Sequence, residues 1–241
     1  MRLAARIVRQ TVDDILGDPL GALICLLTVV LSIVAIWWLW GAAVSILLAF
    51  TAMSWAAIAW HRRVILSERS TWIVPRIPLA TLPRYMITIV IMGVLSLLLT
   101  IPLVWILQVT ASFDTADGRQ YFALGGPAPI SAPVGIAVSL FDAMYYGLVL
   151  RISLLLPALS VGRPQPFRDV WRATDGHFWT LFFPLGAFLM VISTAFNWLS
   201  SVIYFGFVLD LIPAGLLFIL GIGVVTRLHM HFFPEDPAPE T

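Results

Sequence analysis

The sequence has very few charged residues. Asp, Glu, Lys and Arg together make up 11% of the 241 residues, whereas about 25% is usual for a soluble globular chain. Hydrophobic residues make up 60%, and the mean hydropathy is +0.96. So few polar side chains are not enough to coat the surface of a soluble domain of this size. The composition therefore excludes a soluble protein and predicts a chain that lies in a lipid bilayer.

Lysine is absent and cysteine almost so. All 14 basic residues are arginine, which we interpret as the codon bias of a GC-rich, bacterial genome. The single cysteine, Cys25, excludes a disulfide within the chain. The formal net charge of +1 gives no electrostatic reason to expect nucleic acid as a partner.

The common catalytic motifs are also missing. The chain has no His-Glu-x-x-His, no Gly-x-Ser-x-Gly, no phosphate-binding loop and no pair of cysteines. His229 and His231, followed by Glu235 and Asp236, come nearest to a set of metal ligands, but a terminal tail offers them no scaffold. We therefore predict no catalytic site, no metal and no cofactor, and a protein that is not an enzyme.

What the chain does have is long apolar runs. A helix that crosses a hydrocarbon core of about 30 Å needs about 20 apolar residues. Two uncharged or nearly uncharged runs have twice that length, and the first is expected to turn at Trp40–Gly41, since glycine tolerates turn dihedrals. The expected spans are 21–40, 42–60, 86–110, 134–156, 179–199 and 206–226. The prediction is a single all-α membrane domain over 1–241, with six transmembrane helices in three hairpins.

The arginines give these spans an orientation. Of the 14, only Arg119 falls in a segment on the opposite side of the membrane from the others. Because arginine and lysine are enriched in cytoplasmic loops, the arginine-bearing side is predicted to be the cytoplasm. Both termini, including the tail 228–241, are then cytoplasmic, and the predicted location is the inner membrane of a bacterium.

Two segments between the spans have an apolar face at helical spacing. Residues 1–18 and 165–178 each place apolar side chains on one side and arginines on the other, which predicts helices that lie in the headgroup region. The segment from Ser67 to Pro83 contains three prolines. It is therefore expected to be an extended strip along the membrane surface rather than a regular helix.

Polar side chains within the spans indicate a candidate intramembrane site. An ionisable group in the hydrocarbon core is costly, so it points to function by default. Asp142, Asn197 and Asp210 are predicted to lie in the outer half of the membrane, and Tyr145 and Tyr146, at i+3 and i+4, share the helix face of Asp142. Two interpretations stay open. The side chains either line a water-filled pocket open to the outside, as in a transporter, or are each satisfied by neighbouring groups.

Small residues recur along the second span at steps of four and three. The stripe consists of Ser45, Ala49, Ala52, Ala56 and Ala59. Small side chains let another helix approach closely in lipid. The stripe predicts packing either within this protein or against a membrane protein partner.

Two stretches on the predicted cytoplasmic side share their residues with a known group. They are Ala59-Trp60-His61-Arg62 followed by Glu68, and Arg151-Ile152-Ser153-Leu154 with Pro157-Ala158, Gly162 and Val170-Trp171-Arg172-x-Thr174-x-Gly176. The pattern resembles a loose group of bacterial six-helix membrane proteins. This group includes the YciC-like proteins and the membrane domain of certain glycerophosphodiester phosphodiesterases. The resemblance implies an accessory membrane domain and brings no catalytic residue with it.

Some of these motif residues form a second candidate site, at the cytoplasmic face. Its members are His61, Arg62, Glu68, Arg151 and Arg172. They are expected either to brace one another or to clamp an anionic lipid headgroup. The predicted function is that of a lipid-interacting or complex-associated accessory factor, with membrane lipids as partners. The alternative is a small-solute transporter or channel with an outward-facing pocket around Asp142.

Overall fold

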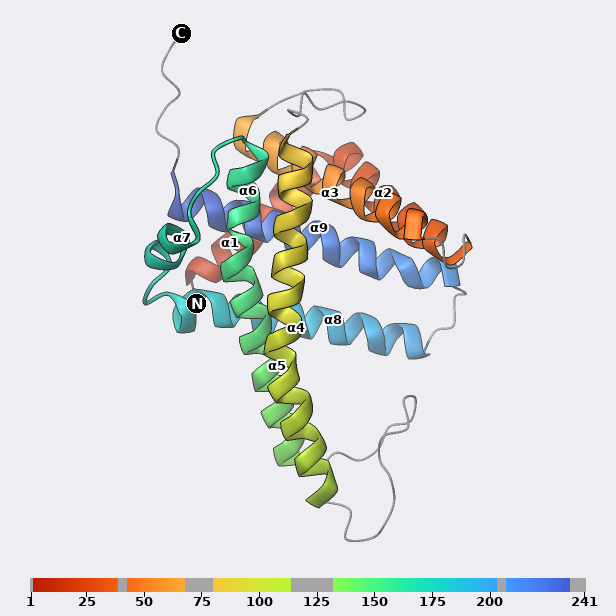
Figure 1. Cartoon of the computed structure of the whole chain (residues 1–241), viewed down its shortest axis with the longest axis vertical. Helices are drawn as coiled ribbons and strands as arrows, with labels where there is room; N and C mark the ends of the chain where they lie inside the picture. Colours follow the sequence, from red (N-terminus) through yellow and green to blue (C-terminus); the bar gives the residue numbers. More distant parts are fainter. Residues whose placement is uncertain (1, 39–42, 68–79, 114–131, 203–206, 235–241) are drawn as a thin grey trace.

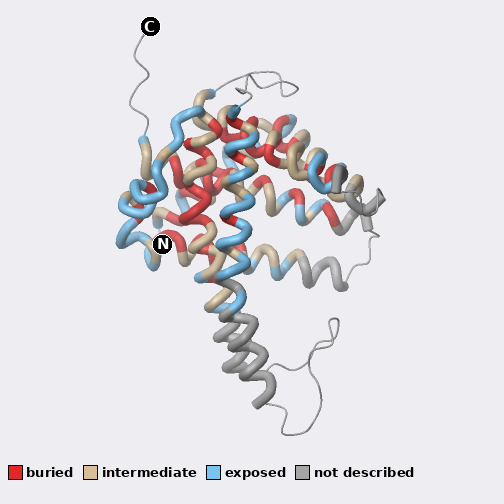
Figure 2. The backbone as a smooth tube through the Cα atoms, in the orientation of Figure 1, coloured by how far each residue is buried: buried red, intermediate tan, exposed pale blue. Residues whose placement is uncertain are grey.

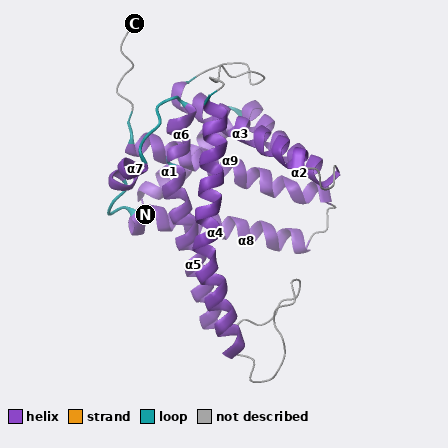
Figure 3. Cartoon of the chain, viewed as in Figure 1, coloured by secondary structure: helices purple, strands orange, loops and turns teal. Residues whose placement is uncertain are grey.

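The structure is a computed structural model that describes residues 2–38, 43–67, 80–113, 132–202 and 207–234. Within these ranges, the side chains of 36–38, 43–45, 99–100, 102–113, 132–138, 197–202 and 207–210 are not described. Every regular element of the described chain is helical, as Figure 3 shows, and this confirms the all-α prediction. The elements are α1 Arg2–Gly17, α2 Pro19–Trp38, α3 Ala43–Leu66, α4 Thr81–Phe113, α5 Ala132–Ser153, α6 Leu155–Ser160, α7 Phe167–Ala173, the π-helical segment η1 Phe178–Phe182, α8 Phe183–Val202 and α9 Phe207–Phe232.

Several helices have the length and composition of membrane spans. Four windows qualify: Thr81–Leu98, Ser139–Ser160, Phe178–Phe196 and Leu211–Phe232. A fifth arises if α1 and α2 count as one span, although the chain bends by 94° between them. The described chain thus has the four or five apolar helices of a membrane protein. The count of six and the three-hairpin layout stay predictions.

The helices run in two directions. α4 and α5 follow the long axis of the molecule, whereas α2, α3, α8 and α9 run across it (Figure 1). α2 packs closely on α3, but α5 packs most extensively on α8, and α9 on α2 and α1. Side-chain bonds join α3, α4 and α9 near the end of α3, the start of α4 and the end of α9. The long helices therefore converge at one end and diverge toward the other.

The core lies where α1, α5, α8 and α9 converge. It is formed by Ile7, Leu150, Leu154, Val170, Leu181, Phe182, Leu185, Leu189, Val224 and Leu228, with Ala4 and Val225 beside them. Figure 2 shows that buried segments gather in this region. α4, by contrast, exposes most of its apolar side chains, including Ile87, Val90, Ile91, Val94, Leu97 and Leu98.

α5 and α8 touch through glycines. A Cβ atom on Gly186 of α8 would collide with the carbonyl oxygen of Ala143 and the amide nitrogen of Gly147 on α5. A Cβ atom on Gly147 would in turn lie 2.8 Å from the carbonyl oxygen of Phe182. The two backbones are therefore in direct contact, an approach that only glycine permits at these positions.

Two helices extend beyond the predicted spans at their polar ends. α3 continues past the expected end at residue 60 to Leu66. α4 begins at Thr81, so Pro83 lies in the first turn of a helix and not in an extended strip. Proline is tolerated there because the first N–H groups of a helix have no intrahelical acceptor. The rest of the strip, 68–79, and the turn at Trp40–Gly41 lie outside the described residues.

The two predicted interfacial helices also differ from expectation. α1 buries Ala4, Ile7 and Thr11, so part of the apolar face expected to meet lipid packs on the protein itself. α7 is shorter than 165–178 and ends at Ala173. The Thr174 hydroxyl donates to the Val170 carbonyl at 2.8 Å, and Gly176 adopts φ +74°, which turns the chain away from the helix.

Candidate functional site

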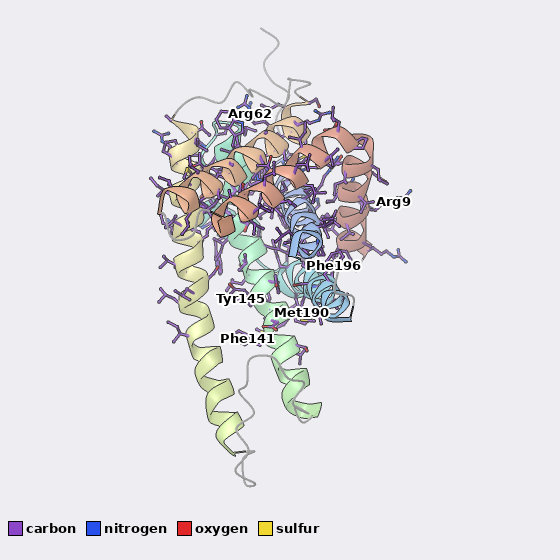
Figure 4. All side chains as sticks on the ribbon, turned by 90° about the vertical axis from the view of Figure 1, so that its right-hand side faces the viewer. Arg9, Arg62, Phe141, Tyr145, Met190 and Phe196 are labelled. Atoms are coloured by element: carbon purple, nitrogen blue, oxygen red, sulfur yellow. The ribbon has the colours of Figure 1, made fainter. Side chains whose placement is uncertain are left out.

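Most of the described arginines gather where the helices converge. The set comprises Arg62, Arg63, Arg84, Arg151, Arg163, Arg168, Arg172 and Arg227, and we call it the arginine-rich end. Three helix ends meet there, because the end of α3, the start of α4 and the end of α9 are joined by side-chain bonds. Figure 4 shows Arg62 at this end, well away from Phe141, Tyr145 and Met190 further along the molecule. Arginines that are far apart in the sequence thus share one end of the fold.

Two ion pairs fix the α1–α2 junction to this end. Arg227 of α9 contacts Asp14 with both Nε, at 2.5 Å, and Nη2. Arg63 of α3 lies 2.6 Å from Asp18, the residue between α1 and α2. These four residues line a polar pocket of about 360 Å³ between α1, α3 and α9. Since each arginine already faces a carboxylate, we interpret this pocket as a structural joint.

A buried histidine links three helices. His61 of α3 is 1% exposed. Its Nδ1 lies 2.7 Å from Thr226 Oγ1 on α9, and its Nε2 lies 3.0 Å from the Tyr85 hydroxyl on α4. Because the Thr226 hydroxyl donates to the Ile222 carbonyl at 2.6 Å, it accepts from Nδ1–H, which leaves Nε2 to accept from Tyr85. Among the described residues no carboxylate pairs with His61, so its burial favours the neutral imidazole, with both nitrogens hydrogen-bonded.

Arg62 and Arg151 brace backbone. Arg62 Nη1 donates to the Ser160 carbonyl, the last residue of α6, at 3.2 Å. Arg151 is only 6% exposed. Its Nε donates to Thr174 Oγ1 and its Nη2 to the Trp171 carbonyl, both at 2.7 Å, and the guanidinium lies 3.7 Å from the centre of the Trp171 ring. Arg151 thus fastens α7 to the end of α5.

Replacing Arg151 with lysine is expected to loosen α7. Lysine lacks the planar guanidinium group, so it cannot reproduce the two hydrogen bonds together with the stacking on Trp171. Hydrogen bonds to charged groups are each worth about 1.5–3 kcal/mol, and a loss of about 1.4 kcal/mol corresponds to a tenfold change. We expect trypsin to cleave after Arg168 and Arg172 about tenfold faster or more, as measured by mass spectrometry of the fragments. Arg84→Lys, at an exposed position of α4, is the matched control; equal cleavage in the two variants would contradict the role of Arg151.

α7 carries apolar and basic side chains together on its exposed surface. Phe167 is 48% exposed and Trp171 38%, and their rings stack with centres 5.6 Å apart. Arg168 and Arg172, one turn apart, are exposed beside them. Tryptophan and arginine are typical of the boundary between hydrocarbon and headgroups. This surface is an exposed part of the arginine-rich end that combines basic and aromatic side chains.

The predicted headgroup site is thus divided between different roles. His61 and Arg151 are buried in contacts within the protein, and Arg62 bonds to α6. Arg172 is exposed on α7, and Glu68 lies outside the described residues. The contacts of His61, Arg62 and Arg151 favour bracing, and their partners among the described residues include Tyr85, Thr226, Ser160, Thr174 and Trp171. Tyr85 and Thr226 are not predicted from the sequence, where the only signal is a polar side chain within an apolar run.

The predicted intramembrane site is only partly described. Asp142, Tyr145 and Tyr146 lie along α5, and the two tyrosine rings meet edge to face with centres 5.9 Å apart. Asn197 belongs to α8 and Asp210 to α9, but their side chains lie outside the described set. Among the described residues, Asp142 is half-buried and makes no hydrogen bond or ion pair. The structure therefore tests this site only for Asp142, Tyr145 and Tyr146, of which the two tyrosines contact each other.

A second, apolar pocket lies between α5, α6, α8 and α9. Its volume is about 310 Å³. It is lined by Tyr146, Val149, Leu150, Ser153, Leu156, Leu189, Ser193, Leu217, Phe218, Gly221, Ile222 and Val225, with His61 of α3 beside them. Tyr146 is the only member of the predicted intramembrane site among these residues.

The stripe of small residues packs at least partly within the chain. Ala49, Ala56 and Ala59 are buried, and the Cys25 thiol of α2 lies 3.8 Å from the Ala56 carbonyl oxygen. Ala52 is half-buried, and the side chain of Ser45 is not described. The stripe therefore brings α2 and α3 together, and a partner subunit on it stays a prediction.

Comparisons with known proteins show no related family, protein or structure. No protein-family model matches this chain, and neither does any curated protein or solved structure. The resemblance to the YciC-like group stays a prediction. Among the described residues, no cluster of three or more His, Cys, Asp or Glu side chains is placed to hold a metal ion.

Proposed function

We propose that this protein is a non-enzymatic integral membrane protein whose arginine-rich end binds the headgroups of anionic lipids. In this proposal the chain crosses a bacterial inner membrane six times, with both termini and the arginine-rich end in the cytoplasm. Its role is that of an accessory, lipid-interacting factor. The cytoplasmic leaflet is rich in anionic lipids, which attract basic segments close to the surface.

The observation that carries the proposal is the exposed surface of α7. Arg168 and Arg172 lie beside the stacked rings of Phe167 and Trp171, and Arg151 holds this short helix in place from below. A headgroup needs a cation that is not already neutralised by a carboxylate, together with apolar groups that reach the acyl chains. α7 offers both, whereas Arg63 and Arg227 are paired with aspartates.

The apolar surface of the molecule supports the membrane part of the proposal. α4 exposes an almost continuous apolar surface over the window Thr81–Leu98, an arrangement suited to lipid and not to water. A layout of six spans must also account for the two directions in which the helices run. Since α4 and α5 run across the direction of α2, α3, α8 and α9, the two groups meet the bilayer at different tilts.

Removing the charge of Arg168 or Arg172 is expected to weaken lipid binding. Each arginine near an anionic surface contributes about 1 kcal/mol, which corresponds to roughly fivefold in affinity. Arg168→Gln and Arg172→Gln should each lower the retention of phosphatidylglycerol relative to phosphatidylcholine by about that factor. Native mass spectrometry of protein released from nanodiscs of mixed composition measures this ratio.

Arg119→Gln supplies the matched control, because Arg119 is the one arginine predicted on the opposite side of the membrane. This variant should retain phosphatidylglycerol as the unaltered protein does. If the double variant Arg168→Gln/Arg172→Gln also retains it unchanged, headgroup binding at α7 is disproved.

A small-solute transporter is less well supported by the geometry. That function depends on a polar pocket around Asp142. The pocket formed by the candidate spans is apolar in its lining, and Asp142 is not one of its residues. The lipid-interacting role therefore accounts for more of the described contacts.

A further inference from the structure

The apolar pocket between α5, α6, α8 and α9 is lined mainly by candidate membrane spans. Twelve of its 13 lining residues come from three of the four helical windows that qualify as spans. The remaining one, His61, closes the pocket from α3. Hydrocarbon chains are the most abundant apolar molecules that such a pocket meets in a bilayer.

Among the described residues, no charged side chain lines the pocket. None of its lining residues is Asp, Glu, Lys or Arg. Burial favours the neutral form of His61, because no carboxylate of the described chain pairs with it. An ionised headgroup would find no counter-ion here, and burying it unpaired is strongly unfavourable. The part of a ligand that enters must therefore be uncharged.

Two hydroxyl groups on the pocket wall have unused hydrogen-bonding capacity. In the part of the chain that the structure describes, neither the Tyr146 hydroxyl nor the Ser193 hydroxyl has a hydrogen-bond partner. Ser153, on the same wall, is different because it donates to the Val149 carbonyl at 2.7 Å. A hydroxyl left unpaired in an apolar medium is costly. These two groups favour a ligand that carries an oxygen acceptor.

The size of the pocket limits the ligand to a single chain. A volume of about 310 Å³ is at the lower end of the range of about 300–1,000 Å³ for small-molecule sites. Such a pocket holds part of one hydrocarbon chain and not the two chains of a phospholipid. We propose that it binds a neutral single-chain lipid, whose hydroxyl or carbonyl oxygen bonds to Tyr146 and Ser193.

Gly221 provides a way to fill the pocket. It lines the pocket, and a Cβ atom built on it meets nothing within 4 Å, so a larger side chain enters empty space without a clash at its root. Gly93 of α4 is equally open but lies on the exposed surface of that helix. Gly221→Phe and Gly93→Phe are therefore a matched pair that adds the same side chain inside and outside the pocket.

The test is photo-crosslinking with a monoacylglycerol whose chain carries a diazirine. The whole protein is held in phosphatidylcholine nanodiscs, and labelled peptides are mapped by mass spectrometry. We expect labelling to concentrate on 146–156, 189–193 and 217–225, and to fall at least tenfold in Gly221→Phe but not in Gly93→Phe. Each lost hydrogen bond is worth about 1 kcal/mol, so Tyr146→Phe/Ser193→Ala should weaken probe binding by more than tenfold.

Competition experiments identify the hydrocarbon chain and the headgroup of the ligand. Displacement of the probe by monoolein or by farnesol supports the proposal, and the stronger competitor tells an acyl chain from an isoprenoid one. Displacement by ionised oleate as effective as that by monoolein would overturn the requirement for a neutral head. Pocket labelling that Gly221→Phe leaves unchanged would overturn the site itself.

A water-filled pocket is the remaining outcome to test. In a Cys25→Ala background, Ser193→Cys should resist a water-soluble thiol reagent, whereas Ser67→Cys, at an exposed position, should react quickly. Equal rates would overturn the proposal.

The inference rests on the membrane location in the proposed function but not on headgroup binding. Loss of the effect at Arg168 and Arg172 would leave the labelling of this pocket intact.

Discussion

Replacing Gly186 with alanine is expected to lower the free energy of unfolding by about 3 kcal/mol, the upper end of the usual cost of overpacking. The added Cβ would collide with the Ala143 carbonyl oxygen and the Gly147 amide nitrogen. Both obstructing atoms are backbone, so no side chain can rotate out of the way. The collision is relieved only if α8 moves off α5, and these two helices share the most extensive helix contact in the described chain.

Alanine substitutions at two further glycines are expected to give a graded series of stabilities. Gly147→Ala should be less harmful, because its Cβ would lie 2.8 Å from the Phe182 carbonyl oxygen and 3.2 Å from the Phe183 amide nitrogen. Gly93→Ala, where nothing lies within 4 Å, should stabilise the helix by up to about 1 kcal/mol. Unfolding in mixed micelles with increasing SDS measures all three. A Gly186→Ala protein as stable as Gly93→Ala would show that α5 and α8 are not in contact.

The apolar runs of the sequence predict the helices well because each run is long enough to be a helix in lipid. The ends of the runs are predicted less well. His61, Arg62 and Arg63 indicate the end of a span if polar residues are assumed to meet water. In the fold each of them finds a partner within the protein, so α3 continues to Leu66. The sequence shows that these side chains are polar but not which group satisfies them.

The contact between α5 and α8 had a signal in the sequence. Ala143 and Gly147 are four residues apart, and this spacing of small residues is typical of close helix packing in membranes. The stripe that begins at Ser45 has the same character and packs α3 on α2. Pattern alone therefore predicts that such helices pack closely, but not on which neighbour, because the choice depends on tertiary contacts between distant segments.

The contacts of His61 lie beyond the reach of sequence patterns for the same reason. Its two partners are 24 and 165 residues away in the chain. In the fold, the segment Ala59-Trp60-His61-Arg62 forms part of a joint between α3, α4, α6 and α9. The polar groups that the sequence suggests for a site are thus used, in large part, to hold helix ends together.

Replacing His61 with leucine is expected to destabilise the protein by about 2–3 kcal/mol. The variant loses two hydrogen bonds, and the Tyr85 hydroxyl is left buried without a partner, which alone costs about 1–3 kcal/mol. Thr226 is less affected because it still donates to the Ile222 carbonyl. Most of the cost is therefore expected at Tyr85, which is 1% exposed.

A double-mutant cycle isolates that cost. In His61→Leu/Tyr85→Phe no hydroxyl remains unpaired, so the double variant should recover at least about 1 kcal/mol relative to His61→Leu. Tyr145→Phe is the matched control, since Tyr145 is half-buried and not part of the network, and it should change stability by less than about 0.5 kcal/mol. Additive effects of the two substitutions would mean that His61 and Tyr85 do not share a hydrogen bond. Recovery in the double variant would instead show that the hydrogen bond between His61 and Tyr85 stabilises the joint between α3 and α4.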